Sequence, residues 1–429
     1  MAFSKKTVRD VDLQGKTVLL RSDFNVPLMP NGEIRDDYRI KQALPTIDFL
    51  LEQNCKIIIC THLGRPEGKP DARYSVRPVA KTLEKLLKKE VKFTSDCVGG
   101  EVEKQTKNLK EKDILLIENL RFYPEEEAND SAFAKKLAGL ADVFVQDGFG
   151  NAHRKHASMD AITEFLPSVA GLLLEKEYLA ITEAMEKPDR PLMAIVGGAK
   201  IADKIEILRK FIQKADFVAV GGAMANTFLL AQGMEVGKSL VDRDDLALAR
   251  KIIEEAKQET RKRQFTFYLP QDSVVATSLE KTAKTRIVDW DAHVIAAIEN
   301  YPRQAPRRAG QVLENELILD LGPFSGAFIA GSMQFCATVI WNGVMGVTET
   351  PGLHGPVGPF AHGTELMLDS MMGQYGHKPY SLIGGGDTSS YVEHRGLTEC
   401  FNHVSTGGGA CLELMTGKKL PAIESLESK

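Results

Sequence analysis

The stretch SLIGGGDTSS, residues 381–390, carries the pattern on which the predicted fold depends. An apolar run ends in three glycines, and an aspartate and a threonine follow. This order is typical of a buried strand that turns tightly into a helix, with glycines that allow close backbone approach to a ligand. The acid could hold a cation, but no lysine follows as in a Walker A loop. Positive charge for a bound phosphate must therefore come from elsewhere in the chain.

The same unit returns along the whole chain: a short apolar run, a turn rich in Gly or Asp, then a helical stretch. The runs are continuous rather than alternating, which indicates parallel strands buried on both faces. They are TVLLR (17–21), KIIICT (56–61), DILLIEN (113–119), DVFVQD (142–147), PLMAIVGG (191–198), DFVAVGG (216–222), FTFYLP (265–270), ELILDLGP (316–323), TVIWNG (338–343) and YSLIGGG (380–386). The sequence therefore predicts an α/β fold with mainly parallel sheets flanked by helices.

The length of 429 residues is too great for one ordinary core, so two domains are expected. A long helical stretch at about 168–187 is followed by KPDRP, a break that predicts the domain boundary at 188–191. The predicted domains are 1–187, which includes this connecting helix, and 188–415, with a terminal segment 416–429.

The overall composition is that of an ordinary globular protein. The net charge of −4 and the pI of about 6.2 do not suggest a nucleic-acid binder, so any basic site must be local. The six cysteines form no CxxC pair, and the first residues lack the apolar core of a secretory signal. No apolar run approaches the roughly 20 residues of a membrane span. These features predict a cytoplasmic protein without a membrane partner.

The turns differ between the two halves of the chain. Those of the first half carry Asp, Asn, His and Arg, whereas those of the second half carry glycines. Ligands of open α/β sheets bind at the carboxyl ends of the strands, where these turns lie. The first half thus predicts side-chain binding of a small anion by Asp23, Asn25, Arg39, His62, Arg65, Arg121 and Arg154. The second half predicts backbone binding of phosphates and a base.

Several single signals allow more than one interpretation. Lys200 and Lys204 share one face of a predicted helix over 199–215, where they bind an anion or simply form a solvated basic face. Asp387 fits a magnesium–nucleotide site or a helix N-cap, and the preceding glycines favour the metal. His153 and His156 could form part of a metal site, but no third ligand follows at an obvious spacing, which disfavours that interpretation.

Two nucleotide motifs are excluded. GGGDTS and GGGACL both lack the third glycine of the G-x-G-x-x-G dinucleotide fingerprint, which argues against a nicotinamide-dependent dehydrogenase. QGMEVGKS (232–239) lacks the first glycine of a Walker A loop and is interpreted as an ordinary helix-ending loop.

From end to end the chain resembles phosphoglycerate kinase. The matching stretches keep the family's order and spacing: RSDFNVPL, DDYRI, THLGRP, ENLRFYPEE, DGFGNAHRKHAS, VGGAKIADKI, LDLGP, WNGVMGV, GGGDT and STGGGACLEL. The resemblance implies two Rossmann-like domains joined by a hinge, and a monomer. It also implies Mg²⁺-dependent phosphoryl transfer between 1,3-bisphosphoglycerate with ADP and 3-phosphoglycerate with ATP. The final KLPAIESL resembles the family's C-terminal stretch, which packs back onto the first domain.

The resemblance also assigns roles to residues. The seven polar residues of the first half stand where the family binds the glycerate. Catalysis is expected from Arg39, Lys200, Gly385 and Gly408, and the metal is expected at Asp387. The nucleotide is expected at Gly198, Ala199, Lys200, Lys204, Gly222, Leu319, Asn342, Val344, Gly346, Val347, Glu349, Gly384, Gly385, Gly386, Asp387 and Thr388.

The match departs from the family's pattern mainly around the expected nucleotide pocket. Val344 replaces a usual proline, Thr348 a usual aromatic residue, and Ile318 a glycine that lies against the adenine in many members. PGLHGPVGP (351–359) is an apparent insertion that predicts an irregular loop. In the first domain, Gly148 and Asn151 stand where Ala and Thr are common.

These departures leave two hypotheses. The first is an active kinase with altered nucleotide preference or affinity. The second is a paralogue that binds ligands with weak or no turnover. Retention of Arg39, Lys200 and Asp387 favours the first.

Overall fold

The computed structural model describes residues 3–290 and 310–429. By the density of internal contacts, the chain divides into two compact units. Unit 1 comprises Met1–Glu183 and Thr406–Lys429, and unit 2 comprises Ala184–Ser405. The chain thus returns to unit 1 at Thr406, ten residues before the segment 416–429 expected from the sequence, and it first leaves unit 1 upstream of the expected break at 188–191.

Unit 1 is built on a six-stranded parallel sheet in the order β3-β4-β2-β1-β5-β6. Its central strands are fully buried on both faces, as continuous apolar runs predict. The strands are β1 (Thr17–Arg21), β2 (Lys56–Cys60), β3 (Val91–Phe93), β4 (Ile114–Leu116), β5 (Val143–Gln146) and β6 (Ser168–Ala170).

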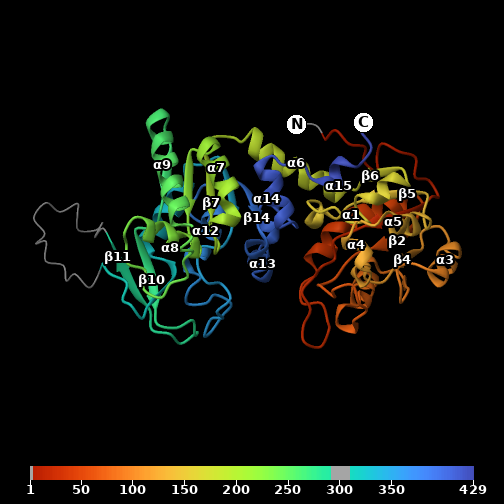
Figure 1. Cartoon of the computed structure of the whole chain (residues 1–429), viewed down its shortest axis with the longest axis horizontal. Coiled ribbons are helices and arrows are strands. Elements are labelled where there is room, and N and C mark those ends of the chain that lie inside the picture. Colours follow the sequence, from red (N-terminus) through yellow and green to blue (C-terminus); the bar gives the residue numbers. More distant parts are fainter. Residues whose placement is uncertain (1–2, 291–309) are drawn as a thin grey trace, which may run out of the picture. The chain divides into compact units, whose positions relative to one another are not determined.

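Helices flank this sheet (Figure 1). The α-helices are α1 (Tyr38–Glu52), α2 (Arg77–Leu87), α3 (Gly100–Lys107), α4 (Pro124–Glu127), α5 (Ser131–Ala138), α6 (Leu172–Glu186), α14 (Gly409–Thr416) and α15 (Pro421–Glu424). Short 3₁₀ turns are η1 (Ala72–Tyr74), η2 (Leu120–Phe122), η3 (Phe149–Asn151) and η4 (Ala161–Glu164).

Unit 2 contains a second six-stranded parallel sheet, in the order β15-β14-β13-β7-β8-β9. Its strands are β7 (Leu192–Val196), β8 (Phe217–Val220), β9 (Thr266–Tyr268), β13 (Thr338–Asn342), β14 (Tyr380–Gly384) and β15 (His403–Val404). Its helices are η5 (Ala202–Lys204), α7 (Ile205–Lys214), α8 (Gly222–Ala231), α9 (Leu246–Lys262), α11 (Pro323–Met333), α12 (His362–Met371), α13 (Gly386–His394) and η6 (Thr398–Cys400). The predicted α/β fold with two parallel sheets is confirmed.

Unit 2 also contains a small antiparallel sheet that the sequence did not predict. It runs β11-β10-β12 over β10 (Asp272–Ala276), β11 (Arg286–Asp289) and β12 (Leu317–Leu321). The run 316–323 was expected in a parallel sheet, and this expectation was wrong. A strand of five residues bounded by a Gly-Pro turn looks the same in sequence whichever sheet it joins.

The helix expected at about 168–187 begins later than predicted. Ser168–Ala170 pairs in parallel with β5, and α6 starts only at Leu172. The buried Asp147 carboxylate explains this start, because its Oδ1 accepts the backbone N–H groups of Leu173 (2.9 Å) and Leu174 (3.2 Å). A capping acid from a distant strand leaves no local signal in the sequence of the helix.

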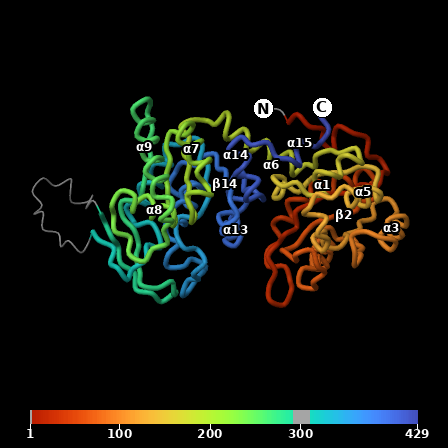
Figure 2. Tube along the Cα trace, viewed as in Figure 1, coloured from red at the N-terminus to blue at the C-terminus, as the bar shows by residue number. Residues whose placement is uncertain are grey.

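The two chain ends lie side by side in unit 1, as the blue and red ends of the trace show (Figure 2). Lys6 N–H donates to the Glu427 carbonyl at 2.8 Å, and the Lys5 ammonium donates to the last carbonyls of the α15 region. The C-terminal stretch therefore packs on the N-terminal residues of the same unit.

Candidate active site

The polar residues predicted in the first half gather in unit 1, at turns that follow the carboxyl ends of β1, β2, β4 and β5 and at the start of α1. Asp23 is 8% exposed and lies among them. Its Oδ2 accepts Arg39 Nη1 at 2.8 Å, and its Oδ1 accepts the Asn25 N–H at 3.2 Å. His62 Nδ1 lies 3.9 Å from Oδ1. The parallel sheet thus brings together side chains that are up to 39 positions apart in the sequence.

Arg21, the last residue of β1, was missed by sequence reasoning although it opens the quoted RSDFNVPL stretch. Its side chain is fully buried, and its Nε donates to Ser158 Oγ at 2.9 Å. The sequence did contain a signal for this residue, because a charged side chain stands at the end of an apolar strand and directly before a predicted ligand-binding turn.

A second group surrounds Gly64, in the turn after β2. Arg121 Nη1 donates to the Gly64 carbonyl at 2.9 Å, and Asn25 Oδ1 accepts the Gly64 N–H at 2.9 Å. Gly64 has φ +64°, and a Cβ there would lie 2.3 Å from the Tyr74 ring, so only glycine fits this turn. Arg65, the next residue, is exposed.

The remaining predicted arginine, Arg154, is half-buried and its Nε donates to His153 Nε2 at 3.3 Å. Its charge also acts on Arg121, whose pKa is lowered chiefly by burial and further by Arg154 and Arg21. All seven predicted residues thus belong to this side of unit 1, with Arg65 at its exposed rim.

The histidines of this region are held neutral. Burial, and then the neighbouring Arg21, Arg121 and Arg39, place the pKa of His62 well below its usual range. Burial and arginines also lower the pKa of His156 to about 3, and that of His153 is lowered by burial and Arg154. The arginines therefore carry the positive charge of the site, which favours an anionic ligand.

Gly148 and Asn151, the two positions of this unit that depart from the family's pattern, flank Gly150 in the turn after β5. A Cβ at Gly148 would lie 3.4 Å from the Asp23 nitrogen, so the alanine common in the family would fit here. At Gly150 it would lie only 2.0 Å from Asp23 Oδ2, so this position requires glycine. Asn151 is nearly buried and contacts both Asp23 and Arg21.

Gly408 belongs to unit 1, although the sequence placed it within 188–415. It directly precedes α14, and the neighbouring Thr406 is held by Glu177 of α6, whose Oε1 accepts both the Thr406 N–H and Oγ1 at 2.7 Å. A Cβ on Gly409 would lie 3.1 Å from His153 Nε2. The glycine turn therefore packs beside the polar turns of unit 1.

Unit 2 contains a cavity of about 220 Å³ at the ends of β7, β8 and β12. Nine of the residues predicted to bind nucleotide line it: Gly198, Ala199, Gly222, Leu319, Val344, Gly346, Val347, Glu349 and Asp387. Apolar side chains such as Leu229 and Leu240 form much of the remaining wall. An apolar cavity with a few polar groups at its edge suits a nucleobase with its sugar.

Most of the other predicted nucleotide residues form a polar cluster near Asn342. Lys204 Nζ donates to Asn342 Oδ1 (2.6 Å) and to its carbonyl (3.0 Å). Thr388 Oγ1 accepts the Gly343 N–H at 2.7 Å, and a Cβ on Gly385 would lie 3.2 Å from the Asn342 amide. Burial lowers the pKa of Lys204 to about 8, although Asp387 opposes this shift.

The GGGDT prediction of a strand, a tight turn and a helix is confirmed. Gly384 ends β14, Gly385 has φ +91°, and α13 begins at Gly386. Asp387 is exposed in the first turn of α13, where Gly385 and not the aspartate is the N-cap residue. Its carboxylate is therefore open to a ligand.

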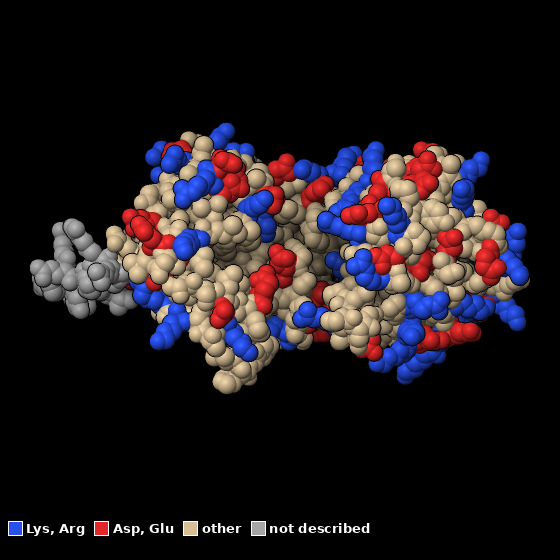
Figure 3. All heavy atoms as spheres, turned by 60° about the horizontal axis from the view of Figure 1, so that its bottom comes forward, with Lys and Arg blue, Asp and Glu red and all other residues tan. Residues whose placement is uncertain are grey.

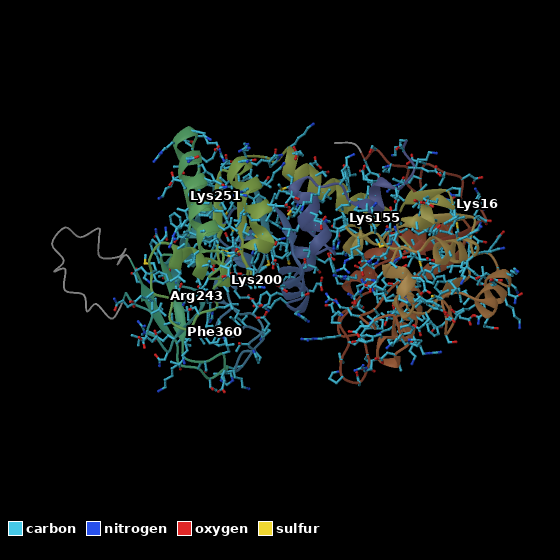
Figure 4. All side chains as sticks on the ribbon, viewed as in Figure 1. Lys16, Lys155, Lys200, Arg243, Lys251 and Phe360 are labelled. Atoms are coloured by element: carbon cyan, nitrogen blue, oxygen red, sulfur yellow. The ribbon has the colours of Figure 1, made fainter. Side chains whose placement is uncertain are left out.

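The helical-face interpretation of Lys200 and Lys204 is wrong. Helix α7 begins only at Ile205, after the 3₁₀ turn η5, and Lys200 lies in an exposed loop (Figure 4). The sequence 199–204 keeps helical periodicity, but Gly198 at φ +109° precedes an irregular turn.

The NGVMG turn (342–346) also opens no helix. The glycine turns at 222, 323, 386 and 409 each open a helix.

The departures around the nucleotide pocket can now be placed. Ile318 and Val344 line the cavity, whereas Thr348 does not. Ile318 is held at a β-bulge, where its N–H donates to Ser239 Oγ at 2.8 Å. Residues 351–359 contain no helix or strand, as their Gly and Pro content predicts. The QGMEVGKS stretch follows the end of α8 and is a helix-ending loop, as predicted.

Asp320 lines the same cavity and was not singled out from the sequence. Burial raises its pKa to about 7, and its oxygens accept the N–H groups of Gly363 (2.9 Å) and Leu321 (2.8 Å). The LDLGP motif contains it, but a buried acid that serves backbone donors has no separate sequence signature.

Within residues 3–290 and 310–429, no cluster of three or more His, Cys, Asp or Glu side chains is arranged to hold a metal ion, and His153 with His156 form no such site. Over the same residues no helix is long and apolar enough to span a membrane. Lys, Arg, Asp and Glu are interspersed on the visible surface of each unit (Figure 3).

The chain is an α/β protein with a cluster of arginines and histidines at the strand ends of one unit and a mainly apolar cavity at the strand ends of the other. The family model described as phosphoglycerate kinase matches residues 8–418. The chain is 44% identical over 427 residues to the phosphoglycerate kinase of Pelotomaculum thermopropionicum, covering 100% of each, and 43% identical over 430 residues to that of Dictyoglomus turgidum, again covering 100% of each.

Solved structures agree with these relatives. The structure of phosphoglycerate kinase from Coxiella burnetii has a TM-score of 0.79 at 36% identity, and that from Pyrococcus horikoshii a TM-score of 0.81 at 29% identity, each covering 98% of both chains. The chain belongs to the phosphoglycerate kinase family. Its activity is phosphoryl transfer between 1,3-bisphosphoglycerate with ADP and 3-phosphoglycerate with ATP. Nothing in the comparisons favours the non-catalytic alternative.

The depressed pKa of His156 predicts a loss of stability in acid. The folded protein keeps His156 neutral, whereas the unfolded chain protonates it below about pH 6.5, so stability is present above that pH and falls as the pH decreases. Each pH unit below 6.5 should lower the free energy of unfolding by roughly 1.4 kcal/mol from this group alone. Urea unfolding at pH 7.5 and 5.5 should show a smaller difference in His156→Gln than in the wild type; equal differences would contradict this assignment.

Proposed function

We propose that Asp23, Asn25, Arg39, His62, Arg65, Arg121 and Arg154 of unit 1 bind 3-phosphoglycerate. The observation that carries this proposal is the gathering of arginines around histidines whose pKa values are lowered, so that the positive charge of these turns comes from the arginines. Arginine suits both the carboxylate and the phosphate of this substrate, because its planar guanidinium can donate two parallel hydrogen bonds.

The nucleotide is assigned to the unit 2 cavity and the neighbouring glycine turns. The base and ribose would occupy the apolar cavity beside Val347 and Glu349. The phosphates would extend toward Lys200, Lys204 and the N–H groups at the start of α13, including Gly384, Gly385 and Gly386. Lys204 already contacts Asn342 in the same polar cluster.

Mg²⁺ is the proposed cofactor, held by Asp387. This carboxylate is exposed in the first turn of α13, and the described residues contain no group of three or more His, Cys, Asp or Glu side chains that could hold a metal ion. A single protein carboxylate suits Mg²⁺, which usually keeps several waters and binds substrate phosphates. The bound ion would neutralise phosphate charge during transfer.

Transfer from ATP forms a bond between a 3-phosphoglycerate carboxylate oxygen and the γ-phosphorus, and it breaks the bond to the ADP oxygen. No proton needs to move, so the protein must position the groups and stabilise charge. We assign charge stabilisation to Arg39 and Lys200, with backbone N–H donors at Gly385 and Gly408. These groups belong to different units, and α6, which contains the unit boundary, is the proposed hinge.

We further propose that the chain acts as a cytoplasmic monomer. None of the six cysteines, all of which lie within the described residues, forms a disulfide, and five of them are buried, which suits a reducing compartment.

Two variants separate the proposed roles. Arg39→Ala should lower kcat by about 10²–10³-fold and leave Mg-ATP affinity nearly unchanged, because the lost donor acts on the transferring group. Asp387→Ala should weaken Mg-ATP binding at least about tenfold and leave 3-phosphoglycerate affinity unchanged. Steady-state kinetics with a coupled dehydrogenase assay and calorimetry would measure both, and each variant is the other's control. Loss of nucleotide affinity in Arg39→Ala would place Arg39 at the wrong substrate.

Ile318 should change the preference of the enzyme among nucleotides. Its side chain lines the cavity and takes up space where many relatives have glycine. We expect Ile318→Gly to raise kcat/KM for ATP relative to GTP by about three- to tenfold. Ile287→Gly is a matched control, since Ile287 is exposed on β11 of the same small sheet. A wild type with ordinary ATP affinity and preference, unchanged by Ile318→Gly, would refute the hypothesis.

A further inference from the structure

Asn151 occupies the centre of the polar site in unit 1, although neither the charge pattern nor the acid–base chemistry of the site points to it. It ends η3, the short turn that follows β5, and is only 6% exposed. With its amide oriented to satisfy both neighbours, its nitrogen donates to Asp23 Oδ2 at 3.0 Å and its oxygen accepts Arg21 Nη2 at 2.9 Å. One neutral side chain thus links a buried cation to a buried anion.

The Asp23 oxygen that Asn151 contacts is the oxygen that holds Arg39. Oδ2 accepts both Arg39 Nη1 at 2.8 Å and the Asn151 amide. The other oxygen, Oδ1, accepts the Asn25 N–H. Rotation of the Asp23 carboxylate would therefore move the anchor of Arg39, and the Asn151 amide opposes that rotation.

The other end of the amide is equally constrained. Arg21 Nε donates to Ser158 Oγ, and Ser158 in turn donates to the buried Glu126 at 2.6 Å. The hydrogen bond to Ser158 therefore holds the Arg21 guanidinium in place, so that its Nη2 donor faces Asn151. Close packing supports this arrangement, since the adjacent Gly150 leaves no room for a Cβ beside Asp23 Oδ2.

We propose that Asn151 is a positioning residue for Arg39, acting through the Asp23 carboxylate. Its amide is suited to this role because it presents a donor to the anion and an acceptor to the cation at the same time. A hydroxyl can also donate and accept, so a threonine here could retain part of the effect. The proposal rests on the proposed role of Arg39 in phosphoryl transfer.

A double-mutant cycle with Arg39 tests whether Asn151 positions Arg39 through Asp23. Asn151→Leu keeps the size of the side chain and removes both hydrogen bonds, so it should lower kcat by about tenfold with a smaller change in KM. In an Arg39→Ala background the same substitution should change kcat by less than about twofold, because the group it positions is absent. Asn151→Thr should recover part of the lost kcat.

The controls separate a structural effect from positioning. Asn108→Leu, at the exposed end of α3, is a matched substitution that should leave kcat unchanged. Equal fold-changes from Asn151→Leu in the two backgrounds, or no change in either, would overturn the proposal. If Asn151→Leu fails to fold, Asn151→Ala replaces it in the same cycle, since it removes both hydrogen bonds without adding a charge beside Asp23. If Arg39→Ala alone leaves kcat intact, the proposed role of Arg39 fails instead.

Discussion

A buried carboxylate that pairs with the partly exposed Arg39 and is linked through Asn151 to the buried Arg21 is the constraint on which the unit 1 site depends. Asp23 is nearly inaccessible, and its two oxygens receive donors from α1, from its own turn and from the turn after β5. An ion pair taken out of water is stable only if its remaining hydrogen-bonding groups are satisfied. Arg21, Asn151 and Ser158 supply those partners. The same constraint leaves Gly150 without space for a side chain and keeps the nearby histidines neutral.

The candidate site of unit 2 is built from other residue types than that of unit 1. Its cavity is lined mainly by apolar residues, with Asp320, Glu349 and Asp387 among the polar ones, and Lys204 lies partly buried against Asn342. Burial lowers the pKa of Lys204 to about 8, and a phosphate beside it would stabilise the ammonium and raise this pKa again. We therefore propose that the two units bind anions by distinct means, one with guanidinium groups and one with backbone and ammonium groups. This difference follows directly from the residue types that terminate the strands in each half of the chain.

The sequence predicted most of this arrangement where the signal was local. Ten apolar runs corresponded to strands, and GGGDT was a strand, turn and helix, because buried parallel strands and glycine turns impose their own residue types. Signals that depend on distant partners were missed or misread. The start of α6 depends on Asp147, the pairing of 317–321 depends on β10, and the 3₁₀ turn before α7 placed Lys200 and Lys204 off a common helix face. Arg21 was missed because its importance comes from Ser158 and Asn151, more than a hundred positions away.

Calorimetric titration of 3-phosphoglycerate into the protein without nucleotide tests the central claim most directly. If the arginines of unit 1 form the glycerate site, one molecule should bind per chain, and affinity should weaken with added salt. Arg121→Met, which keeps an unbranched apolar stem but removes the guanidinium and its charge, should reduce that affinity by at least about tenfold. Binding that survives this substitution unchanged, or that appears only when Mg-ATP is present, would contradict the account.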